Sequence, residues 1–463
     1  MAAQVKDMTV GSPARHILLF ALPLMLGNVL QQCYTMIDSI VIGQFVGMKA
    51  FAAVGAADCL NWIVMGTVIG FCQGLSIQIS QAFGAEDYPA LRKATAMSLL
   101  LSALAALACT AVFVPAAPTI LRLLHTPAGI LPDSAHFLQV MFGGTIVIAG
   151  YNAFSAILRA VGNSRTPLVA MSAAASVNIL LDLLFVVGFR WGVTGAAAAT
   201  VLAQLFACLF CLAAVRRIPA LRLTRGDWVP DAAVIRHLLA LGTPMAFQNA
   251  IIGLGSMVVQ SVINGFGVIF VTGYAAVMKL YGLLELAATS FGFAMASFTG
   301  QNLGAGKYDR IRIGLNAALK LSIAIAAAIS AVILLLGRQI ARLFISGNPG
   351  DVRAAVDVTY HYLFIMGIFL FILYMLYIYR SALQGMGDTV VPMISGIVEL
   401  GMRVACVLLL PIVCGRSGVY FAEVIAWLGA TVLLMGTYYY RIRRLFSRKP
   451  AGREKIERAA CEE

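Results

Sequence analysis

Long apolar stretches alternate with short polar or charged breaks along almost the whole 463-residue chain. A helix needs about 20 mainly apolar residues to cross about 30 Å of hydrocarbon, because each residue adds about 1.5 Å. Stretches of sufficient length fall into two sets of six: 16–45, 51–83, 94–115, 134–158, 167–188 and 193–215, then 237–264, 270–299, 313–336, 357–383, 390–412 and 418–440. The pattern predicts an all-α polytopic membrane protein with twelve transmembrane helices.

The composition excludes a water-soluble globule of this length. Hydrophobic residues make up 61% of the chain and charged residues 11%, and the mean hydropathy is +0.90. Soluble domains carry about 25% charged residues, so this chain has too few to coat a water-exposed surface. The first apolar stretch is too long for the core of a signal peptide, and we expect it to remain as the first transmembrane helix.

The two sets of six helices resemble each other in sequence. Each motif of the first set recurs 220 to 225 positions later: Arg15-His16, Pro23 and Asn28 as Arg236-His237, Pro244 and Asn249; Gln81-x-x-Gly84-Ala85 as Gln301-x-x-Gly304-Ala305; Gly162 as Gly387. Because six is an even number, both copies begin on the same side of the membrane, which predicts two pseudo-symmetric six-helix bundles as a parallel internal repeat. We expect an N-lobe (1–215), a cytoplasmic linker (216–236), a C-lobe (237–440) and a basic cytoplasmic tail (441–463), with a cleft between the lobes.

The net charge of +13 is distributed as a membrane topology signal. With a cytoplasmic N-terminus, the cytoplasmic segments hold 23 Lys and Arg residues, with Arg159 and Arg380 counted among them, and the opposite loops hold 7. Basic loops stay in the cytoplasm, so we expect both termini inside, in the cytoplasmic (inner) membrane of a bacterium-like cell. The basic tail is then a topology determinant beside anionic lipid, and we expect no nucleic-acid partner.

Polar side chains lie at membrane depth in the first lobe. Gln31, Tyr34 and Asp38 share one face of the first helix, Asn178 and Asp182 stand four positions apart in the fifth, and Thr200 lies in the sixth. Buried ionisable groups within the membrane need a partner or a function. Oxygen ligands with two acids suit a hard cation or a proton. The alternative is a set of separate polar residues, each hydrogen-bonded to neighbouring backbone.

The second lobe carries a different set of deep charges. Glu399 and Arg403 have the four-residue spacing of an intrahelical ion pair, which we interpret as mainly structural. Glu285 is not on the same face as Lys279 and could instead face the cleft and meet a cationic substrate. Aromatic and methionine residues near the expected cleft suit loose binding of flat organic cations, or else ordinary helix packing: Tyr34, Met36, Met257, Tyr274, Met278 and Tyr281.

Over about residues 12 to 445 the chain resembles the multidrug and toxic compound extrusion (MATE) transporters. Four segments carry the resemblance: FALPLMLGNVLQQCYTMIDSIVIGQFVG, QISQAFGAEDYPALRKA, ILRAVGNSRTPLVAMSAAASVNILLDLLF and QGMGDTVVPM. The resemblance implies two six-helix bundles that export organic cations and other drug-like compounds in exchange for inward Na⁺ or H⁺.

The resemblance also implies roles for individual residues. Asp38, Asn178, Asp182 and Thr200 match the cation-coupling site of the family's N-lobe, and would be the metal ligands if Na⁺ is the coupling ion. Pro23 matches the proline at which the first helix bends, and Tyr34 and Asn152 match further residues of the same cavity. Family members with a C-lobe cation site carry acids in the seventh and tenth helices. Those stretches here, QNAIIGLGSMVVQ and FILYMLYIY, contain none, so we expect coupling through the N-lobe.

We therefore predict a monomeric secondary antiporter in the lipid bilayer, with small organic substrates, no cofactor apart from a coupling Na⁺ or H⁺, and no enzymatic activity. A lipid-linked saccharide flippase is the alternative, although three deep acids against Lys279 and Arg403 do not favour a pyrophosphate ligand. An intramembrane enzyme is a remote alternative, because HExxH, GxSxG and paired deep histidines are missing from the sequence.

Overall fold

The computed structural model describes residues 5–345 and 349–447, and within these ranges the chain is helical and contains no strand. The first half of the chain forms helices α1 (Pro13–Val41), α2 (Met48–Gly84), α3 (Tyr88–Leu123), α4 (Leu131–Gly143), α5 (Thr145–Ala160), α6 (Arg165–Asp182) and α7 (Gly192–Arg216). The second half forms α8 (Ala232–Asn264), α9 (Val268–Gly304), α10 (Tyr308–Arg342), α11 (Pro349–Ile368), α12 (Leu370–Gly385), α13 (Val390–Cys414) and α14 (Ala422–Ser447).

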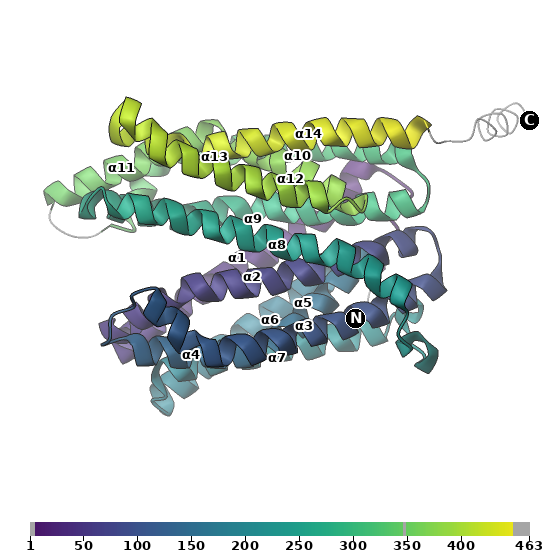
Figure 1. Cartoon of the computed structure of the whole chain (residues 1–463), viewed down its shortest axis with the longest axis horizontal. Coiled ribbons are helices and arrows are strands. Elements are labelled where there is room, and N and C mark those ends of the chain that lie inside the picture. Colours follow the sequence, from purple (N-terminus) through teal and green to yellow (C-terminus); the bar gives the residue numbers. More distant parts are fainter. Residues whose placement is uncertain (1–4, 346–348, 448–463) are drawn as a thin grey trace, which may run out of the picture.

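These helices can make twelve membrane crossings. Ten are long and apolar enough to span alone, and two bent pairs, α4 with α5 and α11 with α12, supply two more when each pair counts as one span. Figure 1 shows the helices running roughly parallel, with the purple-to-blue first half packed beside the teal-to-yellow second half. The predicted all-α fold of two six-helix bundles is confirmed.

Two predicted helices are bent, at equivalent positions of the repeat. The sequence predicts one helix each at 134–158 and 357–383, but the structure divides each into two: α4 and α5 meet at 47° and α11 and α12 at 53°. A hydroxyl from a neighbouring helix binds the backbone just before each bend: Thr110 of α3 donates to the Phe142 carbonyl at 2.8 Å, and Ser330 of α10 donates to the Gly367 carbonyl at 2.6 Å. A side chain inserted into the helical ladder is a known cause of a kink.

Several helices extend beyond the apolar stretches that predict them. Helices α3 and α10 run past the predicted 94–115 and 313–336 at both ends. The linker predicted at 216–236 contains two 3₁₀ turns, and α8 already begins at Ala232, where the Asp231 carboxylate caps the first turn by accepting from the Ala233 amide at 2.9 Å. Helix α14 reaches Ser447 and so includes the first basic residues of the predicted tail. Charged residues at such helix ends lower the local hydropathy, so a hydrophobicity pattern does not include them.

Helices of the two lobes meet along the centre of the molecule. Helix α2 packs against α8 and α9, and α1 packs against α9. Within the N-lobe, α1 also lies against α6, and α6 lies against α7. This arrangement puts the polar face of α1 next to the helices that carry Asn178, Asp182 and Thr200.

Candidate functional site

The structure brings the two acids of the N-lobe together. The Asp38 carboxylate on α1 lies beside the Asp182 carboxylate on α6 and the Thr200 hydroxyl on α7. Asn178 is one helical turn before Asp182 on α6, and these two side chains are buried, with 1% and 0% of their surface exposed. Polar residues separated by up to 162 positions in the sequence therefore form one cluster, here called the N-lobe polar cluster: Asp38, Asn178, Asp182 and Thr200.

Buried oxygen atoms of this cluster lack hydrogen-bond partners among the residues that the structure describes. They include Oδ1 of Asp38, both carboxylate oxygens of Asp182 and Oδ1 of Asn178. Burying such groups without a partner costs several kcal/mol, more if they are charged, so a cation or a proton would stabilise them. No group of three or more His, Cys, Asp and Glu side chains in the described ranges could hold a metal ion. Two carboxylates with an amide and a hydroxyl instead suit a hard cation such as Na⁺, or a shared proton.

Each acid-bearing helix changes geometry within four residues after its acid. Helix α1 continues as a π-helical segment at Ile42–Val46, and α6 continues as one at Leu183–Gly188. The two segments contact each other. Wider π-helical turns occur often at functional sites, so they mark this end of the N-lobe as a place where both helices depart from regular geometry. The 3.6-residue hydrophobic pattern carries no signal for them.

The other predicted N-lobe residues lie around α1. Tyr34 is buried beside Gln204 and packs against Met171. Gln31 lines a small cavity of about 30 Å³, and Pro23 lies inside α1, which continues through it as one helix. Asn152 donates to the Ile148 carbonyl of its own helix at 2.8 Å.

Arg159 is a site residue that the sequence analysis missed, because it was assigned to a cytoplasmic loop. It lies on α5, lines the same small cavity as Gln31, and places its guanidinium 4.7 Å from the ring centre of Phe293 on α9. Arginine over an aromatic face is a favourable contact. Here it joins the N-lobe to the C-lobe at the base of the cavity.

The predicted C-lobe residues lie apart from the N-lobe polar cluster. Glu285 accepts a hydrogen bond from the Tyr377 hydroxyl of α12, so its carboxylate is directed into the C-lobe. Tyr281 stacks on Trp427, with ring centres 6.0 Å apart, and Met257 is half-buried on α8. The Glu285 carboxylate is thus bound to a helix of its own lobe.

The C-lobe contains a buried network of ion pairs. Glu399 pairs with Arg380 and lies 3.8 Å from Arg403, which in turn binds Glu423 at 2.9 Å. All four side chains are at least 94% buried. The sequence predicts only the pair of Glu399 with Arg403. The assignments of Arg159 and Arg380 to cytoplasmic loops are wrong, because α5 and α12 continue through them; without these two, the predicted cytoplasmic segments hold 21 Lys and Arg residues against 7.

One acid and one base on helices of different lobes lie within electrostatic reach of each other. Asp58 is exposed on α2 of the N-lobe and lies within electrostatic reach of Lys279, which is exposed on α9 of the C-lobe. Asp58 is not among the residues predicted from the sequence, where it lies near the start of a long, mainly apolar stretch.

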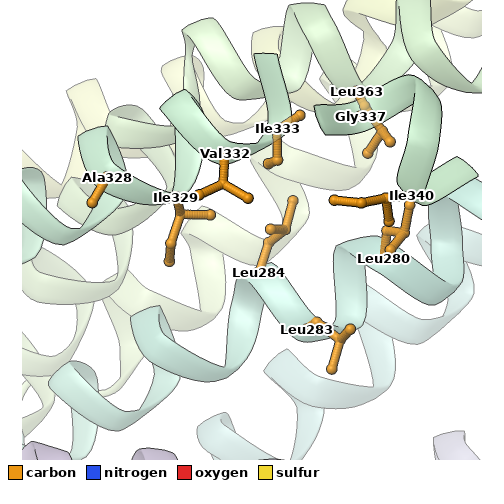
Figure 2. Close-up of a pocket in the computed structure, with 10 residues that line it drawn as sticks. All are labelled: Leu280, Leu283, Leu284, Ala328, Ile329, Val332, Ile333, Gly337, Ile340 and Leu363. Atoms are coloured by element: carbon orange, nitrogen blue, oxygen red, sulfur yellow. The ribbon is translucent and has the colours of Figure 1, made fainter. Parts of the chain in front are cut away.

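A larger cavity in the C-lobe is chemically unlike the N-lobe polar cluster. It has a volume of about 370 Å³ and lies between α9 and α10, with one residue from α11 (Figure 2). Its lining is entirely apolar: Leu280, Leu283, Leu284, Ala328, Ile329, Val332, Ile333, Gly337, Ile340 and Leu363. This lining offers no charged or polar side chain that could bind a cation.

Two repeated six-helix lobes that meet at a central interface, with acids buried at membrane depth, define a polytopic membrane transporter of small molecules. A family model described as MatE matches residues 23–184 and 244–409, one match in each lobe. The chain belongs to this family, the multidrug and toxic compound extrusion transporters.

Individual relatives agree with this family. The chain is 34% identical over 309 residues to the "Probable multidrug resistance protein YpnP" of Bacillus subtilis (66% of this chain, 68% of the relative). It is 23% identical over 430 residues to the "Multidrug export protein MepA" of Staphylococcus haemolyticus (92% and 93%).

Solved structures share the fold at lower sequence identity. A MOP superfamily transporter from Pyrococcus furiosus superposes with a TM-score of 0.90 at 23% identity, over 96% of this chain and 99% of that one. An outward-facing multidrug resistance MATE family transporter superposes with a TM-score of 0.88 at 22% identity, over 96% and 100%.

Proposed function

We propose that this protein exports drug-like, mainly cationic organic compounds from the cytoplasm in exchange for inward Na⁺ or H⁺. The observation that carries the proposal is the pair of adjacent acids from two helices, Asp38 and Asp182, whose buried oxygens lack partners. Drug export is supported by relatives whose names describe multidrug resistance or multidrug export. The protein would lie in the cytoplasmic membrane as a monomer with both termini inside.

Exchange follows from competition for the same negative charge. A cation bound at the N-lobe polar cluster neutralises Asp38 and Asp182, and its release leaves a charge that an organic cation can compensate. Each ligand favours the lobe arrangement in which it binds more tightly, so rocking of the lobes links the two movements. Pro23 would let α1 bend during this change, because it removes one backbone hydrogen bond.

The same four residues can serve either coupling ion. For Na⁺, the oxygens of Asp38, Asn178, Asp182 and Thr200 would be the ligands. For H⁺, the two adjacent carboxylates would share a proton, because like charges at short distance disfavour double ionisation. In either case, the N-lobe polar cluster would release the coupling cation on the side of the membrane where the concentration of that cation is lower.

Gradient-driven dye efflux tests the proposal. Purified protein in liposomes loaded with ethidium is exposed to an inward Na⁺ gradient or, separately, to an inward pH gradient. We expect one of the two gradients to accelerate ethidium efflux above the rate in protein-free liposomes, and an ionophore that collapses the gradient to abolish the effect. Equal efflux with and without both gradients would contradict ion coupling.

A further inference from the structure

Two glutamines reach across the lobe interface in equivalent positions of the repeat. Gln81 at the end of α2 donates to the Gly385 carbonyl at the end of α12, at 2.9 Å. Gln301 at the end of α9 donates to the Ala160 carbonyl at the end of α5, at 2.8 Å. The donors are 220 positions apart and the acceptors 225, the same offsets as in the sequence repeat. Each lobe therefore supplies one donor and one acceptor to a pair of bonds with two-fold pseudo-symmetry.

The glycine of each recurrent Gln-x-x-Gly motif allows this contact. A Cβ atom on Gly84 would lie 1.9 Å from the backbone oxygen of Gln301, and one on Gly304 would lie 1.9 Å from the backbone oxygen of Gln81. Any larger residue at either position would force α2 and α9 apart. Glutamine and glycine of both motifs thus act together at one end of the two helices.

The chain's N-terminal segment crosses the same place. The Lys6 amide donates to the Val161 carbonyl of the N-lobe at 3.2 Å. The Met8 amide donates to Oε1 of Gln301 at 2.9 Å, and Arg310 donates to the Met8 carbonyl at 3.1 Å. Met8 is fully buried. Residues 6–11, here called the strap, therefore bind both lobes, and Gln301 binds the strap and the opposite lobe at once.

We propose that the two Gln-x-x-Gly motifs form a symmetric latch that closes the cytoplasmic end of the cleft, with the strap fastened across it. This inference rests on the proposed rocking of the lobes and names the contacts that rocking must break. Because both hydrogen bonds join the same two bodies, opening breaks them together and frees the strap. The repeat explains why the motif occurs twice: one copy in each lobe is required for a two-fold closure.

Hydrogen exchange of the strap amides tests the latch without any transport assay. The full-length protein in lipid nanodiscs carries Gln81→Met, which removes the amide donor at nearly constant size and does not touch the strap. If latch and strap open as one unit, the Lys6 and Met8 amides should exchange about 3- to 10-fold faster than in the unchanged protein, the range expected for one lost hydrogen bond. Amides of α13 and α14 serve as internal standards and should be unaffected.

Gln248→Met is the matched control. Gln248 is also buried, but it accepts from Gln384 within the C-lobe, so its loss should leave strap exchange unchanged. Wild-type strap exchange in Gln81→Met, with intact α13 and α14, would overturn the latch. If Gln81→Met fails to fold, Gln81→Asn breaks the same bond and is judged by the same outcomes. Failure of ethidium efflux alone would leave this result standing, so the two proposals can fail separately.

Discussion

Replacement of Asp38 by asparagine is expected to abolish cation-coupled efflux while the protein stays folded. Asparagine keeps the size of the side chain but removes the negative charge that faces Asp182. Residues that only hydrogen-bond to a metal ligand usually contribute about 10- to 100-fold to metal affinity. Loss of the charged ligand Asp38 should therefore reduce cation affinity by at least as much. The measurement is the initial rate of gradient-driven ethidium efflux at matched protein density in the liposomes.

Asp58→Asn is the matched control for this substitution. It makes the same chemical change on a transmembrane helix, but Asp58 is exposed on α2 and does not belong to the N-lobe polar cluster. We expect ethidium efflux through the Asp58→Asn protein to stay dependent on the ion gradient. Normal coupled efflux by a folded Asp38→Asn protein would remove the N-lobe polar cluster from the mechanism.

The Glu399→Gln substitution is expected to destabilise the C-lobe by about 3–5 kcal/mol. Glu399 is the carboxylate between Arg380 and Arg403, and all three side chains are almost completely buried. Its replacement leaves the buried charges of Arg380 and Arg403 without a full counter-charge. This lowers the free energy of unfolding much more than the loss of an exposed ion pair does. Thermal unfolding of the purified protein in detergent, followed by tryptophan fluorescence, measures the change.

An exposed ion pair of the same lobe provides the comparison. Asp357 lies 3.3 Å from Arg338, and both side chains are more than half exposed. Asp357→Asn should therefore change the stability by no more than about 1 kcal/mol. Equal stability of the two variants would show that the buried network is not needed to hold the C-lobe together.

The apolar pattern predicts the number of spans and the repeat, but not the bends. Each bend depends on a hydroxyl from another helix, Thr110 or Ser330, and a pattern read along one helix contains no information about its neighbour. The predicted helices are also too short at their ends. The last turns of α3, α10 and α14 carry the basic residues Arg122, Arg342 and Arg444, which lower the local hydropathy, so the apolar pattern ends before the helix does.

Part of the site could be predicted, because an acid at membrane depth is costly and therefore conspicuous. That reasoning selected Asp38 and Asp182, which the structure places side by side. The same reasoning does not identify Arg380 as a buried residue, because a basic residue at the end of an apolar stretch is typical of a loop. Its burial becomes evident only when the structure shows its ion pair with Glu399. The direction of Glu285 likewise depends on the single partner Tyr377 of another helix.

The contacts of the proposed latch also could not be predicted from the sequence, although its motif could be seen there. The recurrence of Gln-x-x-Gly is visible in the sequence, but it reads there only as a mark of duplication. The acceptors, Ala160 and Gly385, belong to the opposite lobes, so the contact exists only in the folded molecule.

The most direct test of ion exchange is to ask whether outward movement of ethidium drives the coupling cation inward. Liposomes that contain the protein and an internal ethidium load, but no ion gradient, are followed for ²²Na⁺ uptake and for internal pH. Coupled exchange predicts that ethidium efflux draws Na⁺ or H⁺ inward in the wild-type protein, and that Asp38→Asn abolishes this movement. Ethidium efflux through the wild-type protein without inward movement of either cation would contradict it.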